Sequence, residues 1–160
     1  MSIKVSSKAF GSNERIPTRY TREGENVSPP IHWEGLPRGT QELALIVEDP
    51  DAPRPEPFVH WVAYKIPPNA AGLEEGISRQ AKPARSVIGA QGKNSFYTLG
   101  YDGPEPPPGH GVHHYHFQLY ALDKPLEAQP KLDNKSLIAS MAGHILDTGE
   151  LVGTYERPGK

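Results

Sequence analysis

The segment ELALIVEDPDAPRPEPFVHWVAYKI, residues 42–66, contains two apolar stretches that are separated by a proline-rich loop. In the first stretch, Glu42–Glu48, both faces of an extended chain are apolar, which is typical of a strand at the centre of a sheet. The second stretch, Phe58–Ile66, is rich in aromatic and β-branched residues, which favour strands. If the two strands are neighbours, the residues beside the loop meet at one edge of a sheet.

Other stretches also have the character of strands. The longest is His113–Leu122, HHYHFQLYAL, which again combines aromatic and apolar residues. Shorter candidates are Ile3–Ser6, residues 31–33, Ser86–Ile88 and Leu151–Tyr155. Many short strands with proline and glycine turns between them favour an antiparallel sandwich or a barrel.

One amphipathic helix is expected over Asn134–Asp147, where apolar residues recur at helical spacing on one face. Asp133 can cap its first turn and Gly149 can end it. Gly143 inside this range weakens the helix by about 1 kcal/mol relative to alanine. We expect the helix to pack on the sheet and to play a structural role.

The composition excludes several classes of protein. Proline accounts for 18 and glycine for 16 of the 160 residues, which argues against a helix bundle. The net charge of −2, from 17 basic and 19 acidic residues, gives no electrostatic support for a nucleic-acid partner. The absence of cysteine excludes a disulfide scaffold and a thiol nucleophile. No run of about 18 apolar residues occurs, so we expect no integral membrane contact. The length and the lack of an internal repeat predict one domain over residues 1–160, and the lack of cysteine suits a cytoplasmic location.

Histidines follow the two proline clusters, Pro50–Pro57 and Pro104–Pro108. Prolines stiffen a loop because the ring fixes φ, and stiff loops that lead into strands can hold a small polar site. Near the first cluster, Asp49 ends one strand and His60 lies early in the next, so the carboxylate can orient the imidazole. The alternative for Asp49 is a role in turn formation, because Asp-Pro steps begin turns.

The second cluster leads into a strand that divides its polar residues between two faces. His113 and Tyr115 lie on one face, whereas His114 and His116 lie on the other. The preceding Gly-His-Gly, residues 109–111, offers backbone N–H groups that can point at an anion.

A metal site is the main alternative, because His114 and His116 place two imidazoles on one strand face. Gln118 and Tyr120 follow on that face, and neither suits zinc or iron. No G-x-S-x-G motif of a serine hydrolase occurs. We therefore expect no metal and no cofactor, and a small metal-dependent or hydrolytic β-barrel enzyme that uses His114 and His116 remains the second hypothesis.

Taken together, DPDAP, the HW-containing strand after it, and GPEPPPGHGVHHYHFQLYALD resemble the phosphatidylethanolamine-binding protein family, also called the Raf kinase inhibitor protein family. The resemblance is greatest to its bacterial and archaeal YbhB/YbcL-like branch. It extends to ENVSPPIHWEGLP (Glu25–Pro37) and ELVGTYER (Glu150–Arg157), so it covers nearly the whole chain. It implies a mainly β protein, an antiparallel β-sandwich with one or two short helices, the clearest near residues 134–147.

The resemblance also implies a non-enzymatic function, the binding of a small anion such as phosphate or a phosphorylated headgroup. Asp49 would then fix a histidine tautomer or bind an ammonium group, and cis peptide bonds would occur at Ala52-Pro53 and Glu56-Pro57. A regulatory role through a phosphorylated protein or an inhibited enzyme is a further expectation, as is a homodimer. The implied ligand-binding residues are Asp49, Ala52, Pro53, His60, Pro107, Gly109, His113 and Tyr115.

Overall fold

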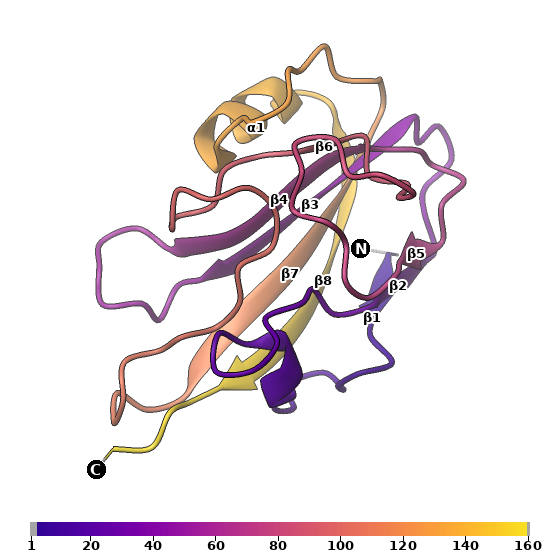
Figure 1. The fold of residues 1–160 in the computed structure, drawn as a ribbon. Coiled ribbons are helices and arrows are strands. Elements are labelled where there is room, and N and C mark those ends of the chain that lie inside the picture. Colours follow the sequence, from indigo (N-terminus) through magenta and orange to yellow (C-terminus); the bar gives the residue numbers. More distant parts are fainter. Residues whose placement is uncertain (1–2, 160) are drawn as a thin grey trace.

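A computed structural model describes residues 3–159 and contains two antiparallel sheets (Figure 1). The larger sheet has the strand order β6-β4-β3-β7-β8. Its strands are β3 (Glu42–Asp49), β4 (Phe58–Ile66), β6 (Ala90–Gln91), β7 (His113–Leu122) and β8 (Ile145–Tyr155). Strand β3 lies at the centre of this sheet, as its two apolar faces predict.

The pairing of β3 with both neighbours brings the polar strand ends together. Asp49 lies opposite Phe58 at the start of β4, and Glu48 lies opposite His116 near the start of β7. The loop between β3 and β4 and the loop that leads into β7 therefore lie at the same edge of the large sheet (Figure 1).

The smaller sheet has the order β1-β2-β5, and its strands are β1 (Lys4–Ser6), β2 (Ile31–Glu34) and β5 (Gly72–Leu73). Trp33 of this sheet and Trp61 of β4 belong to one buried cluster, together with alternate residues of β3 and β7. This main core lies between the two sheets, so the architecture is the predicted antiparallel β-sandwich.

The opposite face of the large sheet carries the helix α1 (Asn134–Met141), with a second apolar cluster beneath it (Figure 1). Leu137 and Met141 of α1 are fully buried in that cluster. Asp133 caps the helix as predicted, because its Oδ1 accepts a hydrogen bond of 2.8 Å from the Ser136 N–H. A short 3₁₀ turn also occurs over Thr18–Tyr20.

The predicted helix end was wrong. The helix stops at Met141, and Gly143 adopts a left-handed φ of 80°, after which β8 begins at Ile145. Gly149, the predicted terminator, lies inside β8 opposite Leu119 of β7. Pairing along most of β7 therefore overrides the helical pattern of residues 145–147, which a sequence pattern cannot anticipate.

The predicted strand at Ser86–Ile88 was also wrong. This segment is a bend in which the Ile88 N–H donates to the Ser86 hydroxyl at 3.1 Å. Such local side-chain bonds compete with strand pairing. The buried Ile88 nevertheless packs into the main core.

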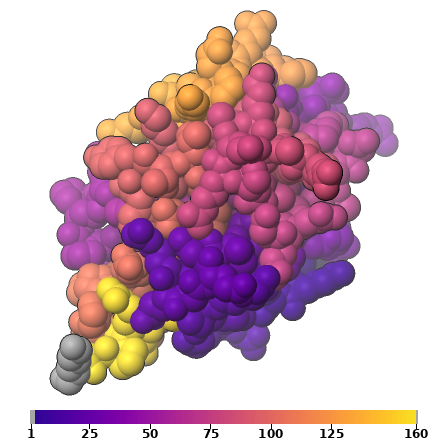
Figure 2. All heavy atoms as spheres, viewed as in Figure 1, coloured from indigo at the N-terminus to yellow at the C-terminus, as the bar shows by residue number. Residues whose placement is uncertain are grey.

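Long irregular segments cover one side of the molecule. Figure 2 shows the indigo N-terminal segment against the magenta and pink segment between β5 and β7. Hydrogen bonds join the two, for example from the Arg22 N–H to the Pro104 carbonyl at 3.0 Å. Within residues 3–159, no helix has the length and apolar character that crossing a bilayer requires.

Candidate functional site

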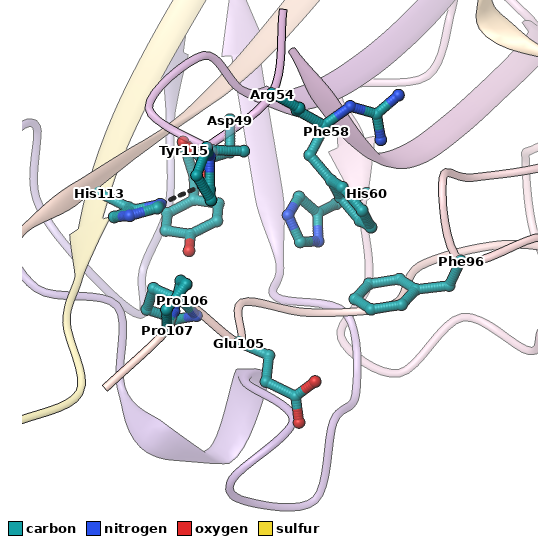
Figure 3. Close-up of a pocket in the computed structure, with 12 residues that line it drawn as sticks. Asp49, Arg54, Phe58, His60, Phe96, Glu105, Pro106, Pro107, His113 and Tyr115 are labelled. Atoms are coloured by element: carbon teal, nitrogen blue, oxygen red, sulfur yellow. Dashed lines mark hydrogen bonds and ion pairs between the residues drawn. The ribbon is translucent and has the colours of Figure 1, made fainter. Parts of the chain in front are cut away.

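A pocket of about 280 Å³ lies where the two proline-rich loops meet (Figure 3). Asp49 and Phe58 come from the ends of β3 and β4, and Tyr115 comes from the start of β7. The pocket is lined by Asp49, Ala52, Pro53, Arg54, Phe58, His60, Phe96, Glu105, Pro106, Pro107, His113 and Tyr115.

The Asp49 carboxylate orients the imidazole of His113. Its Oδ2 lies 2.5 Å from His113 Nδ1, and its Oδ1 accepts a hydrogen bond of 2.8 Å from the Asp51 N–H. Both side chains are almost fully buried, with residue exposures of 3% for Asp49 and 1% for His113. Because a carboxylate accepts, the proton of this bond belongs on His113 Nδ1. Of the two roles considered for Asp49, the geometry matches that of a histidine orienter.

His60 is held in the same tautomer by a backbone group. Its Nδ1 lies 2.6 Å from the Asp102 carbonyl, which can only accept, so Nδ1 donates. Burial lowers the pKa of His60 from 6.5 to about 4, although the Asp102 carbonyl favours the charged form. In the neutral ring Nε2 then carries a lone pair. Figure 3 shows this imidazole between Tyr115 and Phe96.

Asp102 itself is fixed by polar side chains from two loops. Its Oδ1 accepts from Asn26 Nδ2 at 2.8 Å and lies 3.1 Å from Arg22 Nε, and its Oδ2 accepts from the Thr98 hydroxyl at 3.0 Å. The N–H of Gly103 donates to Asn26 Oδ1 at 2.7 Å. The N-terminal segment thereby positions the carbonyl that orients His60.

The close approach of Gly103 to the N-terminal segment gives a testable consequence. A Cβ on Gly103 would lie 2.3 Å from the Tyr20 carbonyl oxygen and 2.8 Å from Asn26 Oδ1. We expect Gly103→Ala to lower the free energy of unfolding by about 2 kcal/mol, and to shift the amide resonance of His60. Urea denaturation and an amide spectrum would measure both, with Gly159→Ala as the control, because a Cβ there comes no closer than 3.4 Å to another atom and the backbone is not left-handed. Wild-type stability of Gly103→Ala would contradict this account.

One wall of the pocket is aromatic and is flanked by guanidinium groups. The rings of Phe58 and Phe96 are 4.7 Å apart in an edge-to-face arrangement, and Arg54 lies 5.4 Å from the Phe58 ring centroid. Glu105 at the rim forms an ion pair of 3.2 Å with Arg22. Among the ion pairs of the described residues none involves Arg54, so Arg54 adds an unpaired guanidinium to a lining that also contains the carboxylates of Asp49 and Glu105.

Tyr115 adds a neutral hydroxyl to the pocket. Burial, followed by the negative charge of Asp49, raises the pKa of Tyr115 well above its usual range. The phenol therefore keeps its proton at physiological pH and can act as a hydrogen-bond donor.

Seven of the eight predicted binding residues line this one pocket within the described part of the chain. Gly109 does not, because its N–H donates to the Arg157 carbonyl at 2.9 Å instead of facing the pocket. The N–H of His110 likewise donates to the Pro107 carbonyl at 3.2 Å. Two of the three N–H groups expected to form an anion nest are therefore engaged within the protein.

The predicted cis peptide bonds were also wrong, since every peptide bond within residues 3–159 is trans. At Ala52-Pro53 the chain turns through a hydrogen bond of 2.7 Å from the Arg54 N–H to the Ala52 carbonyl. This local turn, followed by bends up to Glu56, reverses the loop between β3 and β4 without a cis bond at Glu56-Pro57.

The histidines of the alternative metal site lie on the other face of β7. His114 Nδ1 is 2.7 Å from Asp51 Oδ2, and His116 Nδ1 is 3.1 Å from Glu150 Oε2. No group of three histidine or carboxylate side chains within residues 3–159 is arranged to hold a metal ion. Nothing in this arrangement favours the enzyme hypothesis.

The sequence analysis missed five lining residues. Arg54 and Phe58 lie between Asp49 and His60 in the segment 42–66, so their position in or beside the proline-rich loop could have identified them as lining residues. Glu105 and Pro106 belong to the second proline cluster, Pro104–Pro108, so that cluster was a signal for them as well, whereas Phe96 lies in an irregular segment that gave no signal.

Comparisons with known proteins identify the family of this chain. Residues 6–156 match the family model described as phosphatidylethanolamine-binding protein. A UPF0098 protein of Pyrococcus horikoshii is 50% identical over 157 residues, covering 98% of this chain and 78% of that protein. A UPF0098 protein of Methanothermobacter thermautotrophicus is 45% identical over 156 residues, covering 97% of this chain and 99% of the other.

Two solved structures share the fold. A phosphatidylethanolamine-binding protein homologue of Chlamydia trachomatis has a TM-score of 0.85 and 36% identity, and the match covers 98% of each chain. Escherichia coli YbcL, described as a member of the mammalian family, has a TM-score of 0.89 and 28% identity, covering 98% of this chain and 99% of that one. With a family match over most of its length, this chain belongs to the phosphatidylethanolamine-binding protein family.

Proposed function

We propose that the pocket binds a small phosphate-bearing anion and that the protein acts by binding rather than by catalysis. The observation that carries this proposal is the pair of buried imidazoles, His60 and His113, each fixed through Nδ1 in a pocket that also contains Arg54. Arg54 supplies a positive charge and Tyr115 a hydroxyl donor, which are the groups that phosphate oxygens accept from. The proline-rich rim keeps these groups in place without a ligand.

The proposal predicts that Arg54 contributes directly to affinity. We expect Arg54→Ala to weaken the binding of inorganic phosphate roughly three- to tenfold, because one charge-assisted contact at an exposed rim is lost. Calorimetric titration of phosphate into both proteins measures the change. Arg38→Ala, which removes an exposed arginine outside the pocket, should bind like the wild type, and equal losses in the two variants would contradict a specific role for Arg54.

Binding should also couple to protonation of His60. Because burial holds the pKa of His60 near 4, the ring is neutral without ligand, and a bound anion favours its charged form by Coulomb attraction. Sulfate does not itself titrate between pH 7 and pH 5, so we expect its affinity to rise as the pH falls, by up to about tenfold per pH unit for one coupled proton. A sulfate affinity that is independent of pH would contradict this coupling.

A phosphate group can come from a free anion or from a lipid headgroup, and three probes distinguish them. Inorganic phosphate tests the shared chemistry, phosphorylethanolamine adds an ammonium group, and a glycerophosphoethanolamine diester adds the lipid linkage. Tighter binding of the last two would identify a headgroup as the ligand. A regulatory role through a phosphorylated protein would use the same pocket, so Arg54→Ala would weaken that interaction as well.

A further inference from the structure

We propose that His110 is a displaceable cap on His113, so that a ligand must replace His110 before it can use the second pocket histidine. This inference rests on the proposed anion site and adds a residue that regulates access to it. It arises from a chain of three side chains, His110, His113 and Asp49, that leads from the exposed loop into the protein interior.

Both ring nitrogens of His113 are already engaged. Nδ1 faces Asp49, and Nε2 lies 2.6 Å from His110 Nδ1. The two imidazole rings are 4.8 Å apart between centroids and inclined at 60°. Because Asp49 fixes the proton of a neutral His113 on Nδ1, Nε2 accepts and His110 Nδ1 must donate. A ligand in the pocket therefore finds no free nitrogen on His113.

The backbone of the loop around His110 is held in a defined conformation. Gly109 and Gly111, on either side of His110, have left-handed φ values of 73° and 96°. The loop is tied to the C-terminal segment by the bond from the Gly109 N–H to Arg157 and by a bond of 2.5 Å from Arg157 Nε to the Pro106 carbonyl. The side chain of His110 is held by one neutral hydrogen bond and is exposed, so it can rotate away without disturbing the core.

Replacement of His110 requires a ligand of matching chemistry. The Nε2 lone pair of His113 accepts a hydrogen bond, and a phosphate that carries a proton offers a P–OH donor. The P–OH group can take the place of the His110 Nδ1–H while its other oxygens accept from Tyr115 and Arg54. His110 therefore competes with the ligand for one acceptor, and its removal should tighten binding.

The experiment is a titration of inorganic phosphate into the wild type and three variants. We expect His110→Ala to bind phosphate roughly two- to tenfold more tightly, since a neutral hydrogen bond no longer has to be broken. His110→Asn, whose amide nitrogen can replace Nδ1 as a donor, should lie closer to the wild type. His144→Ala removes a surface histidine paired with Asp123 at 3.0 Å and should leave affinity unchanged. Unchanged or weaker binding by His110→Ala would overturn the proposal.

Ring-nitrogen NMR gives a second readout that does not depend on binding. In the absence of phosphate, the Nε2 resonance of His113 should move between the wild type and His110→Ala, because the nitrogen loses its donor. An Nε2 resonance at the same position in both proteins would overturn the proposal that His110 caps His113. If phosphate binds neither protein, the anion-site proposal fails, and the His113 resonance alone then decides whether His110 caps that nitrogen.

Discussion

The Asp49→Ala variant should have a free energy of unfolding about 3 kcal/mol lower than that of the wild type. The Asp49 carboxylate is buried and accepts two hydrogen bonds, from His113 Nδ1 and from the Asp51 N–H. Its removal leaves a buried imidazole N–H and a backbone N–H without acceptors, in addition to a small cavity. This loss would appear in urea denaturation at neutral pH.

Two further substitutions test the cause of that loss. Asp51→Ala removes a neighbouring carboxylate that is partly exposed and bonds His114 outside the pocket, so we expect a loss of less than about 1 kcal/mol. Asp49→Asn keeps the shape and one acceptor, and its stability should lie between those of Asp49→Ala and the wild type. Equal stability of Asp49→Ala and Asp51→Ala would refute the orienting role of Asp49.

The second large effect is an acid-dependent loss of stability caused by His60. Burial lowers the pKa of this group from 6.5 to about 4, so between these pH values the unfolded chain binds a proton that the folded protein does not. Burial of the neutral His60 ring therefore does not reduce the free energy of unfolding above pH 6.5, but that free energy falls as the pH drops from 6.5 towards 4. A shift of this size corresponds to about 3 kcal/mol.

The variant His60→Asn separates this effect from other acid-labile groups. Its amide nitrogen can still donate to the Asp102 carbonyl, but it does not titrate. We expect the wild type to lose about 3 kcal/mol more than His60→Asn between pH 7 and pH 4, as measured by urea denaturation at several pH values. Parallel pH profiles for the two proteins would show that His60 does not carry this penalty.

The sequence predicted the parts of the fold that depend on local pattern. The two apolar faces of β3 indicated a central strand. Along β7 the alternation of side-chain direction separated His113 from His114. The helix end was missed because residues 145–147 fit a helix locally but pair with β7 in the folded protein. Non-local pairing of this kind leaves no mark in a short window of sequence.

Only part of the candidate site was predicted, for a similar reason. Asp49, His60 and His113 stand beside proline-rich loops at strand ends, which made them recognisable as a group. Asp102 was missed because its role depends on its backbone carbonyl and on Asn26, which is 76 residues away in the chain. His110 was visible in the sequence, but its contact with His113 Nε2 depends on the loop conformation that Gly109 and Gly111 permit.

A crystal structure of the protein grown with inorganic phosphate tests the central claim most directly. The account predicts a phosphate in the pocket between Arg54 and Tyr115, with oxygens within hydrogen-bonding distance of His60 Nε2 and of the Tyr115 hydroxyl. A pocket that holds only water, in crystals where phosphate is bound elsewhere on the protein, would contradict the claim that this is an anion-binding site.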